Sequence, residues 1–230
     1  MNNPKPQVFA VVPCTNDDPY LVSCISHLTT FVDDYYVHYD PKGRLLQHEG
    51  NWRTGLLETA VSHFKPISGI DWILVNDSDE FLGQRTPFKL QDELGWAVAD
   101  ATYKHHATAL LFAREELWEL DPPYARVDKA WGNQKNLRMF RYVEGMPLNT
   151  RDVPLACGSI PVAAEAHALD VSQRIKVTHA GYAAPDDRKM RFERYIGKPG
   201  HGPAHIESIL DSAPTLVPAV IEAKIERWGK

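Results

Sequence analysis

Short apolar runs alternate with segments of helical periodicity in the N-terminal part of the chain, and this alternation limits the fold more than any other feature. Three runs, residues 8–12, 34–39 and 72–75, are rich in β-branched or aromatic side chains, which is typical of strands. Between them, apolar residues recur at spacings of three and four over residues 21–29 and 56–64, as on the buried face of a helix. Strand, helix, strand, helix, strand indicates an α/β protein with a mixed, mostly parallel sheet, because parallel strands need a crossover connection.

The remainder of the chain is less regular. Residues 108–112 and 137–143 are predicted to form two further strands, and residues 145–161, which contain three prolines, are predicted to be a loop. Asp18 and Asp186 are predicted to cap helices, because an Asp side chain accepts hydrogen bonds from the free N–H groups of a first turn. The apolar residues of the C-terminal tail favour short amphipathic helices.

A chain of 230 residues allows between one and two domains. We predict one main domain over residues 1–184 and a helical C-terminal segment over residues 185–230 that packs on it. The 25 basic and 30 acidic side chains give a formal charge of −5. This balance disfavours a broad nucleic-acid-binding surface but leaves room for a local basic patch.

Neither membrane insertion nor disulfide bonding is expected. No apolar run exceeds five residues, whereas a membrane-spanning helix needs about 20, and residues 1–6 lack the apolar core of a signal peptide. The three cysteines, Cys14, Cys24 and Cys157, include no CxxC pair, so we expect small buried thiols and neither a disulfide framework nor a zinc finger. A cytoplasmic protein without membrane spans is the resulting prediction.

An acidic cluster follows the third predicted strand. Asp77, Asp79 and Glu80 come directly after residues 72–75, and in an open parallel sheet ligands bind beyond the carboxyl ends of the strands. Carboxylates that repel one another favour a hard divalent cation, since Mg²⁺ and Mn²⁺ take oxygen ligands. A turn that begins at Asp77 is needed to bring the two aspartates together. The alternative is a solvated acidic turn in which Asp77 caps a helix.

Residues 71–82, DWILVNDSDEFL, resemble the DxD motif of GT-A glycosyltransferases in the form DWIL-x-x-D-x-DEF found in family 2-like enzymes. The resemblance covers residues 7–83. A second segment, residues 176–182, is similar to the family's late strand that ends in His, and the basic helix predicted over residues 188–195 also has family counterparts. Residues 84–175 show no such similarity.

The resemblance implies a GT-A (Rossmann-like) three-layer α/β sandwich and a metal-dependent transfer of a sugar. The implied donor is a nucleotide-diphosphate sugar of the UDP type, and the acceptor is a hydroxyl of a glycan, a small molecule or a modified nucleic-acid base. The implied cofactor is Mn²⁺ or Mg²⁺, with Asp77, Asp79 and His179 as its ligands. For His179, a hydrogen-bonded core histidine is the alternative.

The resemblance also implies donor-binding side chains at the strand ends, at the start of the second helix, in the acidic turn and on the basic helix. They are Pro13, Asn16, Asp40, Arg53, Asp77, Ser78, Arg188 and Arg191. Arg53 has the alternative of a solvated arginine at a helix terminus, and the basic helix has those of binding a polyanionic acceptor or of local ion pairs. The chain departs from the family where Pro41 follows Asp40, since small polar residues are usual there.

Deprotonation of the acceptor hydroxyl needs a carboxylate within hydrogen-bond reach if the reaction inverts the anomeric centre. Glu115, Glu116 and Asp121 follow the strand predicted at 108–112 and are the candidates, with Glu115 preferred. The alternative is surface charge leading into a helix.

Two other functions remain open. A haloacid-dehalogenase-type phosphatase also carries DxD after a strand and uses a later acidic pair, for which Asp186-Asp187 is the candidate. That family usually has Thr or Val where Phe81 stands here, and capping of a helix explains the later pair. A GT-A-like scaffold that binds a sugar nucleotide without turnover is the non-enzymatic alternative.

Overall fold

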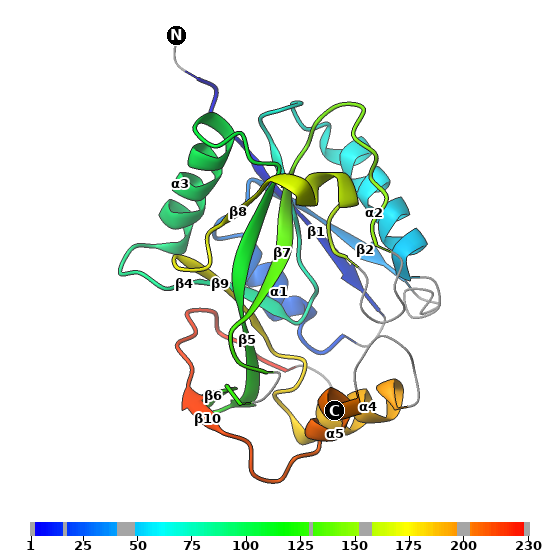
Figure 1. Ribbon diagram of the computed structural model, residues 1–230, viewed down its shortest axis with the longest axis vertical. Coiled ribbons are helices and arrows are strands. Elements are labelled where there is room, and N and C mark those ends of the chain that lie inside the picture. Colours follow the sequence, from blue (N-terminus) through cyan, green and yellow to red (C-terminus); the bar gives the residue numbers. More distant parts are fainter. Residues whose placement is uncertain are drawn as a thin grey trace.

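The computed structural model describes residues 3–15, 18–40, 49–128, 131–151, 158–196 and 203–227. Within these ranges the chain is an α/β protein with one mixed sheet of ten strands and six helices (Figure 1). The strands are β1 (Val8–Cys14), β2 (Asp34–Tyr39), β3 (Trp72–Val75), β4 (Glu80–Gln84), β5 (Ala109–Leu120), β6 (Pro123–Arg126), β7 (Gln134–Arg141), β8 (Ala168–Asp170), β9 (Ile175–His179) and β10 (Leu216–Pro218). The helices are α1 (Leu21–Leu28), α2 (Glu49–Phe64), α3 (Leu90–Tyr103), the 3-10 helix η3 (Val162–His167), α4 (Pro185–Tyr195) and α5 (Pro203–Ser208).

The strand order is β10-β6-β5-β7-β3-β1-β2, with β4 paired to β9 and both β8 and β9 paired to β5. The pairs β1–β2 and β1–β3 are parallel, as predicted. The prediction of a mostly parallel sheet is wrong, because β7 runs antiparallel to β3 and β5, and β6 runs antiparallel to β5. In this half the chain reverses through turns and loops, which suffice for antiparallel neighbours.

Helices cover both faces of the sheet, so that three layers result (Figure 1). Side chains of β1 alternate between two cores: Ala10 and Val12 belong to the core shared with α1 and α3, whereas Val11 packs with α2. All seven residues of β1 are buried. A strand covered on both faces is a continuous apolar run rather than an alternating one, as residues 8–12 are.

Two predicted helix caps are wrong. Helix α1 begins at Leu21 rather than after Asp18, and the Asp18 carboxylate accepts a hydrogen bond from the backbone N–H of Tyr20 at 3.1 Å, in the loop before the helix. Helix α4 begins at Pro185, whose missing N–H costs nothing at a first helical position. Asp186 therefore lies in the first turn, where its charge still favours the helix dipole.

The C-terminal tail is not helical after α5. Strand β10 pairs antiparallel with β6, and residues 219–227 contain no helix or strand. Ile221, Ala223 and Ile225 pack against the core at a spacing of two, which fits an extended chain rather than a helix. The tail is fixed to α1 where the hydroxyl of Ser23 donates to the carbonyl of Glu226 at 3.0 Å.

The structure agrees with the expected cysteine chemistry. Cys14 and Cys24 are free and buried, as predicted, and Cys157 lies outside the described residues. No helix in the described part of the chain is both long and apolar enough to cross a membrane.

Candidate functional site

A charged cavity of about 950 Å³ lies beyond the carboxyl ends of β1 and β3. Its described acidic lining residues are Asp18, Asp77, Asp79, Glu80, Glu116 and Glu165. Its described lysines and arginines are Arg53, Arg114, Lys135, Arg138, Arg151, Arg191 and Arg194. So many side chains of opposite charge in one cavity form an ion-pair network, and they suit a polar, charged ligand rather than an apolar one.

The acidic cluster forms the turn that its sequence predicts. The backbone N–H of Glu80 donates to the carbonyl of Asp77 at 2.9 Å, which closes a four-residue turn. The buried amide of Asn76 donates to the carbonyls of Asp77 and Glu80, both at 2.9 Å, and thereby fixes the turn from inside. Both aspartates face the cavity, but they bind different partners.

Asp77 is held by two arginines. Its carboxylate lies 3.0 Å from Arg53 on α2 and 3.3 Å from Arg138 on β7. Burial raises the pKa of Asp77, but the charges of Arg53 and Arg138 outweigh this effect and hold the pKa below its usual value. Asp77 is therefore an ionised member of an ion-pair network, and its ion-pair partners differ from those of Asp79 among the described residues.

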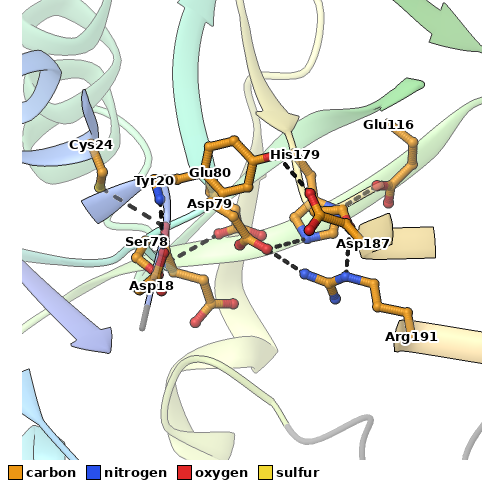
Figure 2. A network of polar contacts seen from close by, with 12 residues as sticks. Asp18, Tyr20, Cys24, Ser78, Asp79, Glu80, Glu116, His179, Asp187 and Arg191 are labelled. Atoms are coloured by element: carbon orange, nitrogen blue, oxygen red, sulfur yellow. Dashed lines mark hydrogen bonds and ion pairs between the residues drawn. The ribbon is translucent and has the colours of Figure 1, made fainter. Parts of the chain in front are cut away.

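Asp79 instead faces His179 and the basic helix (Figure 2). Its Oδ2 lies 3.1 Å from Nε2 of His179 and accepts a hydrogen bond from Nη2 of Arg191 on α4. The carbonyl of Asp79 accepts a hydrogen bond from the N–H of Ala180 at 2.7 Å, which fixes the acidic turn beside the end of β9. Burial raises the pKa of Asp79, but His179 and Arg191 hold it far below its usual range.

His179 stands between two carboxylates because of strand register. Strand β9 runs between β4 and β5 and pairs His179 with Glu80 on one side and with Glu116 on the other. Nδ1 of His179 lies 2.5 Å from Glu116, and its Nε2 faces Asp79. Burial lowers the pKa of His179, but Asp79 and Glu116 raise it above its usual value.

The two candidate bases on β5 lie on opposite faces of the strand, because successive side chains alternate. Glu116 is buried, contacts Arg114 and His179, and has a pKa of about 2, since these two partners outweigh the opposing effect of burial. Glu115 is bound at 2.6 Å by Lys176 and lies outside the cavity lining. The preferred candidate, Glu115, is thus the one that does not face the site.

Only some of the other predicted donor-binding residues line the cavity. Pro13 and Ser78 line the cavity. Asp40 is buried after β2 but is not a lining residue among those described, and Asn16 lies outside the described residues. Arg188 donates to the carbonyls of Trp118 and Tyr182, both at 2.7 Å, and is not among the described residues that line the cavity.

Several cavity residues were not predicted as site residues. Asp18 accepts a hydrogen bond from Ser78, and burial together with the charge of Asp79 raises its pKa. Arg114 and Arg138 project from β5 and β7 into the ion-pair network. Arg138 stands among the apolar residues Leu137, Met139 and Phe140, and this charge was the available signal, because a buried charge in a sheet needs a partner.

The described residues contain no group of three or more His, Cys, Asp or Glu side chains that could hold a metal ion. Asp79 and His179 nevertheless fit two positions around one cation. Neighbouring ligands of an octahedral ion with bonds of about 2.1 Å lie about 3 Å apart, and Oδ2 of Asp79 lies 3.1 Å from Nε2 of His179. The remaining positions suit phosphate oxygens and water, as is usual for Mg²⁺.

Neither a protein-family model nor a curated protein sequence matches this chain in the comparisons made.

Proposed function

We propose that the protein is a metal-dependent glycosyltransferase of the GT-A type that transfers a sugar from a UDP-type nucleotide-diphosphate donor to a hydroxyl acceptor. One observation carries the proposal: Asp79, in the acidic turn, and His179, at the end of β9, direct an oxygen and a nitrogen to within 3.1 Å of each other in a cavity rich in arginine. The parallel β2-β1-β3 unit that ends at this cavity supports the GT-A assignment.

The chemistry of the proposed reaction suits this charge distribution. When the sugar leaves a nucleotide diphosphate, negative charge develops on the diphosphate and must be stabilised. A Mn²⁺ or Mg²⁺ ion held by Asp79 and His179 would supply positive charge at the departing phosphate oxygens. Arg191 and Arg194 line the same cavity and would stabilise the charge that the ion leaves uncompensated.

Glu116 fits a positioning role better than that of a base. A carboxylate that accepts the N–H of one imidazole nitrogen orients the ring and leaves the other nitrogen available for a metal ion. Glu116 occupies that position relative to His179. With a pKa of about 2 and an ion pair to Arg114, it is a poor proton acceptor near neutral pH.

The phosphatase alternative lacks comparable support. Asp77, the nucleophile in that reaction, is held by Arg53 and Arg138. Asp187, from the candidate later pair, accepts a hydrogen bond from the hydroxyl of Tyr20 at 2.9 Å (Figure 2). It also forms an ion pair with Arg227 at 2.8 Å. A carboxylate engaged in this way links the C-terminal tail to α4 and is not directed at the acidic turn.

A thermal-shift panel of nucleotide diphosphates and nucleotide sugars, with and without Mn²⁺, tests the proposal. We expect UDP or a UDP-sugar to raise the melting temperature only with Mn²⁺, since the stabilisation by a ligand increases with its affinity and its concentration. Asp79→Asn should remove the shift, and the control Asp100→Asn, a half-buried residue of α3 outside the cavity lining, should retain it. If no nucleotide diphosphate shifts the wild type, or if Asp79→Asn keeps the shift, the proposal is wrong. Release of UDP from the donor separates an enzyme from a silent scaffold.

A further inference from the structure

Arg191 occupies the oxygen of Asp79 that a cation would need. Its Nη2 donates to Oδ2 of Asp79, and the same oxygen faces Nε2 of His179 at 3.1 Å. A guanidinium and a divalent cation repel each other, so they compete for one carboxylate oxygen. Binding of a cation by Asp79 and His179 therefore requires Arg191 to move.

The remaining contacts of Arg191 allow such a movement. Its Nε donates to the carbonyl of Gly181 at 2.7 Å, its Nη1 lies 3.3 Å from the hydroxyl of Tyr195, and the guanidinium lies over the ring of Tyr182. All three partners are uncharged, so Asp79 is the only carboxylate among the described residues that forms an ion pair with Arg191. When Arg191 leaves Asp79, one ion pair is broken, and Arg191 loses no ion pair with a second described carboxylate.

A second cation, Arg194, lies one helical turn further along α4 and lines the same cavity. Within the described part of the chain, Arg194 makes no ion pair. The other lysines and arginines of the lining each pair with a carboxylate: Arg53, Arg114, Lys135, Arg138, Arg151 and Arg191. Residues three apart lie on the same side of a helix, so a displaced Arg191 and Arg194 can bind one anionic group together.

We infer that Arg191 is an exchangeable counter-ion: it neutralises Asp79 while no cation is bound, and it transfers to the diphosphate of the donor, beside Arg194, when the cation takes its place. This inference rests on the proposed function and adds to it the order in which charged groups replace one another at Asp79. A largely buried arginine that loses its carboxylate is destabilised unless another anion replaces it. Cation and diphosphate therefore bind cooperatively, and the cation alone binds weakly.

The test is a calorimetric titration of MnCl₂ into the wild type and into the variants Arg191→Gln and Arg194→Gln, first without ligand and then at saturating UDP. Without UDP, Arg191→Gln should bind Mn²⁺ more tightly than the wild type, by roughly tenfold, in the range of typical coupling free energies. Arg194→Gln should change this affinity much less, because Arg194 has no ion pair with Asp79 among the described residues. With UDP, the wild type should gain most in Mn²⁺ affinity, and both variants should gain less.

The possible outcomes separate this inference from the function on which it rests. If the wild type binds no Mn²⁺ even with UDP, the proposed function itself is wrong. If the wild type binds Mn²⁺ with UDP but Arg191→Gln binds Mn²⁺ alone equally or more weakly, Arg191 is a structural support of Asp79 and the inference is overturned. Arg191→Lys, which keeps the charge, serves as the second variant and should retain weak Mn²⁺ binding. Circular dichroism verifies that each variant is folded.

Discussion

Nδ1 of His179 lies 2.5 Å from Oε2 of Glu116 on the neighbouring strand, and this contact orients the imidazole so that its Nε2 faces Asp79. The contact follows from the pairing of β9 with β5, in which the two residues are direct partners. It links a buried carboxylate of the sheet to the acidic turn through one ring. The site is thus supported by regular strands rather than by loops alone, which favours a fixed ligand geometry.

Replacing Glu116 should weaken metal binding without removing a ligand. In Glu116→Gln the ring of His179 loses its charged partner, and we expect Mn²⁺ affinity in the presence of UDP to fall by roughly 10- to 100-fold, as for other partners of metal-binding histidines. Glu115→Gln is the matched control, because this neighbour lies on the other face of β5 and pairs with Lys176. Equal effects of the two substitutions on Mn²⁺ affinity, measured by calorimetry, would contradict the assigned role of Glu116.

Replacing Asn76 should destabilise the acidic turn. Asn76→Ala removes two hydrogen bonds to the carbonyls of Asp77 and Glu80 in a buried position. The loss should lower the free energy of unfolding by about 1–3 kcal/mol, measured by urea denaturation. It should also reduce UDP binding with Mn²⁺, since the turn carries Asp79. A variant with unchanged stability and binding would show that the turn holds its shape without the amide.

Gly181 leaves room for the contact between Arg191 and Asp79. A Cβ at position 181 would clash with Nη2 of Arg191 and would lie 2.5 Å from Oδ2 of Asp79. Gly181→Ala should therefore separate the pair and lower the free energy of unfolding by about 1–3 kcal/mol, as for other disrupted buried ion pairs. Gly55→Ala is the control: it lies in α2 with no atom near the added Cβ, so stability should stay equal or rise by about 0.5–1 kcal/mol. If both variants lost the same free energy of unfolding, the close approach of position 181 to the Arg191–Asp79 pair would be contradicted.

The pKa of His179 predicts opposite pH dependences for stability and for metal binding. Its pKa is raised in the folded protein, because Asp79 and Glu116 outweigh burial. The stabilisation is therefore complete below the unfolded pKa of about 6.5 and is lost as pH rises through the folded value. Mn²⁺ needs the unprotonated ring, so its affinity should increase over the same range.

Urea denaturation in EDTA from pH 5.5 to 9 measures the first dependence. We expect the wild type to lose stability with rising pH relative to His179→Gln. If both proteins respond identically to pH, His179 is not coupled to these carboxylates as the structure indicates.

The sequence predicts local elements well where periodicity is strong. The second and third strands begin and end as expected, at Asp34–Tyr39 and Trp72–Val75. Helix α3 was missed although Leu90, Leu94, Ala97, Val98 and Ala101 recur at helical spacing and are buried. Strand direction in the second half of the sheet was not predictable, since pairing between distant segments leaves no periodic signal.

The candidate site was predictable only in part. The acidic turn and His179 stand out by their position after apolar strands, and both line the cavity. Their neighbours depend on register: β9 must lie between β4 and β5 to bring Glu116 rather than Glu115 to His179. A shift of one residue would exchange the two glutamates, and no pattern within a single segment fixes that register.

The most direct test of the central claim is release of UDP from a panel of UDP-sugars by the purified protein. The reaction is followed with Mn²⁺ and with EDTA, for the wild type, Asp79→Asn and the control Asp100→Asn. The account predicts Mn²⁺-dependent release by the wild type and by Asp100→Asn, and a loss of about 100-fold or more in Asp79→Asn, because transition-state charge loses its main stabiliser. Release that is equally fast in EDTA, or that survives in Asp79→Asn, would contradict a metal-dependent transfer at this site.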